Sequence, residues 1–242
     1  MPGRDPELWK HRHTLVTNAA SRRDTFQGQT LNSVTVEPVE FQDVLAQRRM
    51  HRSFLPDPVA AESIERIVRT IRRAPSGGYS QGQSLVVVTD AGLRRRIADA
   101  FEEQSYVETG APPFISTAPL HIVISATERL YHDRYNEPDK LQATGGVEIT
   151  WPVPYWFVDA GALMMLIQLA AIDEGLASAF IGHPDQKRIF DELLGLPEDV
   201  VPIGLALIGH PAEDPLRARG TSRMKTRRRP LEDVVHRERW RG

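Results

Sequence analysis

The segment APSGGYSQGQS, residues 74–84, has the residue types and spacing of a binding loop. A mononucleotide loop of the GxxxxGK[ST] type needs a lysine and a hydroxyl residue after its last glycine, and neither follows Gly82. A dinucleotide fingerprint lies between a strand and a helix, whereas here a helical pattern precedes the loop and an apolar run follows it. What remains is a glycine-rich loop whose backbone can approach a flat ligand, with Ser, Tyr and Gln side chains for hydrogen bonds. A plain connection between two elements fits the same residues.

Arginine is concentrated upstream, in RRMHRSF at residues 48–54. Arg48 and Arg52 are four residues apart and are predicted to share one helix face, with Arg49 adjacent. Cations near a helix C-terminus complement the helix dipole, so these residues alone favour a solvated helix end.

The elements that must position both segments are predicted from apolar spacing. A helix begins near Phe41, and apolar residues at 64, 67, 68 and 71 predict an amphipathic helix that ends at Ala74-Pro75. Further helices are predicted over 91–103 (with Asp90 as its cap), 157–174 and 184–195, and buried strands over 85–88, 120–124, 177–181 and 203–208. Residues 127–155 are polar and aromatic, and they are predicted to form one long loop of the lid or binding-loop kind. The mixture predicts a layered α/β or α+β domain.

Composition excludes several classes of protein. The chain of 242 residues can bury a core as one domain or at most two small ones, and its net charge of -2 gives no general attraction to nucleic acid or membrane. With no cysteine there is no disulfide, thiolate zinc site or cysteine nucleophile, and the isolated histidines predict no metal site. The N-terminus is too polar for a secretory signal, and the most apolar helix is expected to fall short of a membrane span. These features predict a cytoplasmic protein with no membrane or nucleic-acid partner.

Two parts of the chain leave alternatives open. Residues 1–38 show no period and are predicted to be an extended arm before a single domain at 39–242. From Leu216 to the end there are ten Lys/Arg residues against three acids, which is typical of a solvated or nucleic-acid-binding arm. The helix at 157–174 is apolar on nearly every face, so we expect it to be buried in the core or against a partner subunit.

Four motifs in order resemble the FMN-dependent nitroreductase family. RRMHRSF and then RRAPSGGYSQGQSLVVV are similar to the family's RRSxRxF and APSxxNxQPW. WFVDAGALMMLIQLAAIDEGLASAFIG resembles its central helix and flavin-facing strand, GLPEDVVPIGLALIGHP its last core strand, and RRRPLEDVVH its C-terminal phosphate-binding signature. The resemblance covers about Glu40 to His236.

The resemblance implies an α+β fold of α/β/α layers, with a central mixed sheet flanked by helices, in an intertwined homodimer with two FMN sites at the subunit interface. It places Arg48, Arg49 and Arg228 at the FMN phosphate and ribityl chain, with Arg227 as a neighbouring candidate, because arginine forks suit phosphate. Arg52 would lie near flavin N1 and the C2 carbonyl, and the backbone of Ile181 and Gly182 would face N5. The remaining candidates for the pocket wall are Met50, Pro75, Ser76, Gly77, Tyr79 and Gln81.

The family has no obligatory acid, base or nucleophile, because the cofactor carries the chemistry. The resemblance implies ping-pong electron transfer from NAD(P)H through FMN to a small organic acceptor such as a nitroaromatic, quinone or enone. Tyr131, Tyr135, Trp151 and Tyr155 are candidates to stack on that substrate, and loop packing explains them equally well.

The chain departs from the family pattern at three places. Met50 replaces the usual Ser, Tyr79 replaces Asn, and Gly82-Gln83 replaces Pro-Trp. The loop also resembles that of the flavin-cleaving dimethylbenzimidazole synthases, although the missing Pro-Trp and the RYNEPDK segment argue against that branch. A biosynthetic flavin oxidase and a non-catalytic flavin-binding protein stay open, as does the choice among NADH, NADPH and a deazaflavin as donor.

Overall fold

The computed structural model describes residues 40–213 and 229–240, which belong to one compact unit, Glu37–Gly242. The predicted arm at 1–38 and the candidate ligands Arg227 and Arg228 lie outside the described residues.

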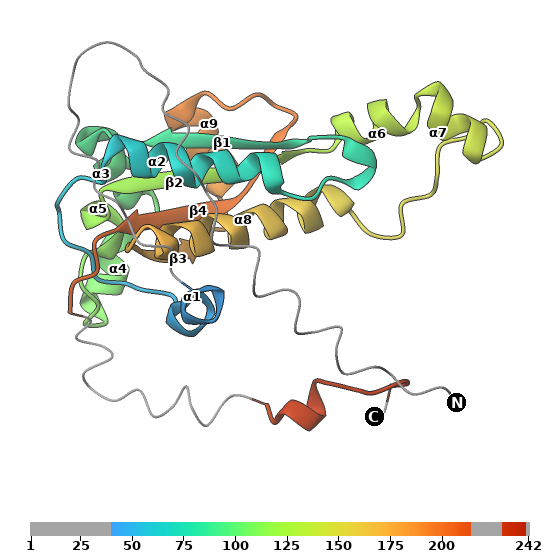
Figure 1. The fold of residues 1–242 in the computed structure, drawn as a ribbon. Helices are drawn as coiled ribbons and strands as arrows, with labels where there is room; N and C mark the ends of the chain where they lie inside the picture. The colour runs from blue at the N-terminus through green and yellow to red at the C-terminus, as the bar shows by residue number, and fades with distance from the viewer. Residues whose placement is uncertain (1–39, 214–228, 241–242) are drawn as a thin grey trace, which may run out of the picture. The chain divides into compact units, whose positions relative to one another are not determined.

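A four-stranded sheet in the order β1-β2-β4-β3 forms the centre of the fold (Figure 1). Its strands are β1 (Gln83–Val88), β2 (Leu120–Thr127), β3 (Ala177–Ile181) and β4 (Val200–Gly209). Val86 pairs with Val123, Val123 with Leu205, and Ala179 with Leu207. Every pair among these described strands is antiparallel, so the parallel pairing expected of a mixed sheet is not found in this part of the chain. The four predicted strands are confirmed, with β1, β2 and β4 longer than expected.

Helices cover both faces of the sheet, because β2 sends apolar side chains to both sides. Val123 packs in one core with residues of α3 (Ala91–Ala100), α5 (Phe114–Thr117) and α9 (Gln186–Leu194). Ile122 and Ile124 pack in a second core with residues of α2 (Ala61–Val68), α6 (Arg129–Tyr135) and α8 (Tyr155–Asp173). The predicted α/β/α layering is confirmed.

Helix boundaries follow local signals. The Asp90 side chain accepts a hydrogen bond from the Leu93 amide at 2.7 Å, which confirms the predicted cap of α3. The helix expected over 91–103 ends at Ala100, and α4 (Glu103–Glu108) begins after Glu102, whose φ is 55°. The 3-10 helices η2 (Arg69–Arg73), η3 (Gly77–Tyr79) and η4 (Leu231–Asp233) complete the described elements.

The arginine segment, residues 48–52, is not helical. α1 (Phe41–Gln47) ends before it, and Arg48 has extended backbone angles, φ −60° and ψ 114°. The prediction that Arg48 and Arg52 share a helix face is therefore wrong. The segment runs along the β3 edge, where the His51 amide donates to the Ser178 carbonyl at 2.9 Å.

The single long loop expected over 127–155 is also wrong, because this stretch contains α6 and α7 (Pro138–Ala143). Both helices extend from one end of the sheet (Figure 1). They are short and mostly polar, so they lack the apolar period that identifies a longer amphipathic helix.

α8 has 19 residues with a mean hydropathy of 1.6, long and apolar enough by length and composition to cross a membrane. The expectation that this segment falls short of a span is therefore corrected. Ala160, Leu163 and Ile167 of α8 are fully buried in the second core, and core helices of soluble proteins pass the same test. Phe157, Val158 and Met165 of the same helix are exposed in the single chain.

Candidate functional site

Loop 75–81 connects η2 to β1 through an unusual backbone. Gly78, Tyr79 and Gln81 have φ of 59°, 65° and 53°, and only the first of them is a glycine. The left-handed region costs a residue with a side chain roughly 1–2 kcal/mol. The loop therefore needs contacts that hold this shape.

Hydrogen bonds inside the loop supply part of that support. Ser76 accepts from the Tyr79 amide through its carbonyl at 2.8 Å and from the Gln81 amide through its hydroxyl at 2.5 Å. The Ser80 hydroxyl donates to the Gly77 carbonyl at 2.6 Å. The first residue of β1, Gln83, donates from its side chain to the Pro75 carbonyl at 2.6 Å.

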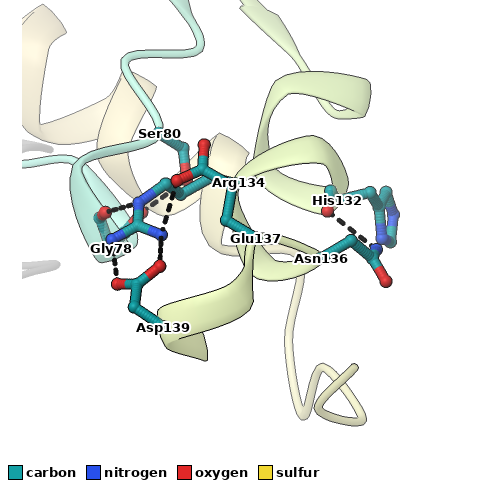
Figure 2. Close-up of polar contacts among 8 residues, drawn as sticks. Gly78, Ser80, His132, Arg134, Asn136, Glu137 and Asp139 are labelled. Carbon is teal, nitrogen blue, oxygen red and sulfur yellow. Dashed lines mark hydrogen bonds and ion pairs between the residues drawn. The ribbon is translucent and has the colours of Figure 1, made fainter. Parts of the chain in front are cut away.

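α6 holds the loop from one side. Arg134 donates from Nε to the Gly78 carbonyl at 2.9 Å and makes paired 2.8 Å contacts with Asp139 and a 3.0 Å contact with Glu137 (Figure 2). The hydrogen bond from Arg134 lowers the pKa of the Asp139 carboxyl to about 2. Arg134 is thus held in the orientation that reaches Gly78.

α8 holds the loop from another side through Asp159. Its Oδ2 accepts from the Gly77 amide and from the Tyr131 hydroxyl, each at 2.8 Å. Burial, and then the hydrogen bond to Asp159, raise the pKa of the Tyr131 phenol. Sequence reasoning missed Arg134 and Asp159. An acid inside the apolar run YWFVDAGALMMLIQLAAI was the available signal for Asp159, because a buried charge needs partners.

Two glycines of this region are required by close packing. A Cβ on Gly78 would lie 2.6 Å from the Tyr135 ring, and one on Gly82 would lie 2.5 Å from the Tyr131 ring and 2.8 Å from the Thr127 carbonyl oxygen. Position 82 thus has no room for a side chain, which fits the presence of Gly82-Gln83 where the family motif has Pro-Trp.

The four aromatic residues predicted to contact substrate lie together. Ring centroids are 4.5 Å apart for Tyr135 and Trp151, and 6.1 Å apart for Trp151 with both Tyr131 and Tyr155. Tyr131 is 0% exposed, so its ring cannot stack on a substrate here; it packs under the loop instead. The structure corrects the predicted role of Tyr131, and a substrate contact stays a prediction for Tyr135, Trp151 and Tyr155.

Glu148 ties the far end of this aromatic group to α6. Its carboxylate contacts His132 Nδ1 at 2.6 Å and accepts from Trp151 Nε1 at 2.7 Å and Asn136 Nδ2 at 2.8 Å. The hydrogen bond to Glu148 raises the pKa of His132, and the indole hydrogen bond lowers the pKa of Glu148.

The arginine segment contrasts with the loop. The side chains of Arg48 and Arg49 form no hydrogen bond or ion pair with any described residue, and the Arg52 side chain has a ring contact only, 6.0 Å from the Phe114 centroid. Arg49 and His51 line a pocket of about 80 Å³ with the end of α8 and the start of β3. Arg48, Met50 and Arg52 are not among the residues that line this pocket.

The predicted site residues lie at opposite edges of the sheet. Loop 75–81 leads into β1, whereas the arginine segment and Ile181-Gly182 adjoin β3. Three strand spacings, about 14 Å, lie between the two edges. One chain therefore does not bring the loop and the arginines together along the sheet.

Comparisons with known proteins show which family and which fold the chain shares. A model described as the nitroreductase family matches residues 45–210. The chain is 29% identical over 199 residues to an FMN reductase [NAD(P)H] of Bacillus subtilis, covering 80% of this chain and 72% of that protein. It is 30% identical over 175 residues to an NADPH-flavin oxidoreductase of Vibrio harveyi, covering 72% and 66%.

A solved structure, NfrA1 of B. megaterium, has a TM-score of 0.61 at 24% identity, covering 83% of this chain and 75% of that one. A putative NADH dehydrogenase/NAD(P)H nitroreductase of Bacteroides thetaiotaomicron has a TM-score of 0.58 at 21% identity, covering 83% and 98%. The fold is shared with these proteins, and the chain belongs to the nitroreductase family.

Proposed function

We propose that the protein is an FMN-dependent oxidoreductase that transfers electrons from NAD(P)H through FMN to a small organic acceptor. The family membership and the names of the two relatives, an FMN reductase and an NADPH-flavin oxidoreductase, support flavin chemistry. The observation that carries the proposal is that the chain offers two complementary segments, the charged arginine segment and the glycine-rich loop 75–81. The arginine segment offers guanidinium groups with no protein counter-charge among the described residues, and loop 75–81 offers a braced wall with a close-approaching backbone.

These residues fit FMN. A terminal phosphate is a suitable partner for Arg48 and Arg49, since guanidinium groups donate paired hydrogen bonds to phosphate oxygens. Arg227 and Arg228 are proposed as further phosphate ligands, and Arg52, Met50, Ile181 and Gly182 as neighbours of the flavin ring. Ser76, Tyr79 and Gln81 are proposed as polar contacts from the loop, with Pro75 and Gly77 completing that wall. Bound FMN supplies the capacity to accept a hydride and to pass on electrons.

We propose that the site is completed in a homodimer. The loop and the arginines lie on opposite sheet edges within one chain, so a second chain can bring its loop to the first chain's arginines. The exposed apolar residues Phe157, Val158 and Met165 of α8 give such a dimer an apolar surface to bury. A cytoplasmic location remains part of this proposal.

The test begins with the flavin. Protein expressed with ample riboflavin should carry non-covalent FMN, and extraction of FAD or of no flavin would refute the cofactor assignment. NADH or NADPH should bleach the flavin absorbance under anaerobic conditions. Bound flavin that no donor bleaches would favour the second candidate, a non-catalytic flavin-binding protein.

Steady-state kinetics then test the shared site. With donor and acceptor using one flavin face in turn, double-reciprocal plots should be parallel, and intersecting lines would contradict ping-pong transfer. The acceptor screen includes nitroaromatics, quinones and enones. It also includes iodotyrosine, because a protein of Haliscomenobacter hydrossis that is 27% identical to this chain is named iodotyrosine deiodinase.

Arg52 tests the placement of charge. A cation beside the ring stabilises added negative charge, so Arg52→Ala should lower the reduction potential of bound FMN relative to the wild type. An unchanged potential in spectroelectrochemical titration would remove Arg52 from the proposed site.

A further inference from the structure

Asp159 is a buried carboxylate without a cation. It lies in the first half of α8, is 7% exposed, and forms no ion pair with any residue in 40–213 or 229–240. Burial of a charge is costly unless hydrogen bonds compensate it. The two hydrogen bonds that its Oδ2 accepts, from the Gly77 amide and the Tyr131 hydroxyl, supply that compensation.

One of the two donors, Gly77, lies in loop 75–81, and the other, Tyr131 of α6, packs against that loop. Gly77 begins the turn in which Gly78, Tyr79 and Gln81 take left-handed backbone angles. Tyr131 lies beneath the loop, with its ring 3.5 Å from the position of a Cβ on Gly77. A single oxygen of Asp159 therefore joins α8, α6 and the loop.

The exposed side chains of the loop are those of Pro75, Tyr79 and Gln81. Tyr79 is 73% exposed although it occupies a strained backbone region, so the strain does not serve to bury the Tyr79 side chain against the described residues. Strain of this kind is kept where surrounding contacts fix the geometry of a functional wall.

We infer that Asp159 is a positioning residue for FMN, which fixes the wall formed by loop 75–81 through the Gly77 amide and the Tyr131 hydroxyl. The inference rests on the proposed function, because it assigns the loop to the flavin. Asp159 itself makes no contact with the cofactor in this scheme. Its contribution is an acceptor oxygen at one place.

The experiment compares Asp159→Ala with Asp159→Asn. Alanine removes the acceptor, whereas the asparagine carbonyl oxygen can accept both hydrogen bonds without the charge. The first readout is amide hydrogen exchange of residues 76–82 in the flavin-free protein, and the second is the FMN dissociation constant. We expect Asp159→Ala to speed exchange in the loop and to raise the dissociation constant about tenfold, as for one net hydrogen bond. Asp159→Asn should stay within about threefold of the wild type.

Glu174→Ala is the matched control. Glu174 follows the last turn of the same helix and accepts from Arg66 at 2.5 and 2.7 Å. It lies 15 residues from Asp159, about 22 Å along the helix axis. This variant should change neither exchange in the loop nor FMN affinity.

Three results would overturn the inference. They are unchanged loop exchange in Asp159→Ala, loosened exchange with unchanged FMN affinity, and an asparagine variant that behaves like alanine. If Asp159→Ala does not fold, Tyr131→Phe removes one of the two bonds, and unchanged exchange at 76–82 in that variant would also overturn it. A wild type that binds no FMN would instead refute the proposed function.

Discussion

Loop 75–81 and the arginine segment 48–52 are both candidate walls of one flavin site, yet the chain treats them differently. The loop is held by hydrogen bonds among its own residues, by one from Arg134 and by one that the Gly77 amide donates to Asp159. The arginine segment bonds to β3 through the His51 amide and to the Ala212 carbonyl through the His51 ring, and the side chains of Arg48 and Arg49 have no charged or hydrogen-bonding partner among the described residues. The loop is thus held in shape by contacts within the protein, whereas the arginine segment offers positive charge that no described residue neutralises.

On the function proposed above, the difference follows from what each wall would recognise. A flat ring requires a surface of fixed shape, so the loop carries backbone strain and the bonds that maintain it. A phosphate requires positive charge that is not already neutralised, and guanidinium groups paired with carboxylates would lose affinity for it. The comparison predicts that changes in the arginine segment alter ligand affinity and leave stability nearly unchanged. Changes in the loop should alter both.

The largest expected effect is on FMN binding by Arg48→Ala. A hydrogen bond to a charged group contributes roughly 1.5–3 kcal/mol, so the dissociation constant should rise about 10- to 150-fold. Titration of flavin-free protein with FMN measures it, and chemical denaturation without flavin should show little change. Arg95→Ala, an exposed arginine of α3, is the control and should bind FMN like the wild type. Equal affinity in both variants would remove Arg48 from the phosphate site.

Gly82→Ala, at the end of the loop, should instead change the stability of the flavin-free protein. A Cβ here meets the buried Tyr131 ring and the Thr127 carbonyl oxygen, and neither can move freely. Overpacking of this kind costs about 1–3 kcal/mol in free energy of unfolding. Urea denaturation of the flavin-free protein measures that cost.

Gly92→Ala is the matched control for Gly82→Ala. Gly92 lies in the first turn of α3, is exposed, and would approach only the Asp90 side chain, at 3.2 Å. Alanine is the better helix former, so this variant should be neutral or more stable by up to about 1 kcal/mol. If the two variants have the same stability, the loop is not as closely packed as the comparison requires.

Much of this contrast could be predicted from the sequence. The apolar spacing predicts all four strands, the family resemblance implies the α/β/α layers, and the arginines and the glycine loop stand out by residue type. The errors of the sequence-based prediction have physical causes. The arginine segment leaves the helix because the His51 amide pairs with Ser178 of β3, which is 127 residues away in the chain. The partners of Asp159 and Arg134 and the burial of Tyr131 depend on how α6 and α8 meet the loop, and no local pattern names those partners, although the acid at 159 in an apolar run signals that it needs some.

The smallest expected effect concerns the far end of α6, where the Glu148 carboxylate bonds His132, Asn136 and Trp151. The raised pKa of His132 means that its contribution to stability is complete below about pH 6.5 and is lost as pH rises through the folded-state pKa. The lowered pKa of Glu148 means that its contribution is present above about pH 4.5 and is lost as pH falls through the folded-state value. The cluster should therefore be strongest between about pH 4.5 and 6.5.

His132→Gln tests whether this cluster also braces the loop through α6. Because His132 is 39% exposed, solvent screens the pair, and the loss in free energy of unfolding should be below about 1 kcal/mol. The loss should be larger at pH 6 than at pH 8.5, since only the protonated ring adds a charge attraction to its hydrogen bond with Glu148. His210→Gln is the control, because that ring makes no hydrogen bond or ion pair with the described residues. A loss that is the same at both pH values would show that the His132 ring acts by packing against Trp151 and Trp156, whose ring centroids lie 6.1 and 5.8 Å away, rather than by charge.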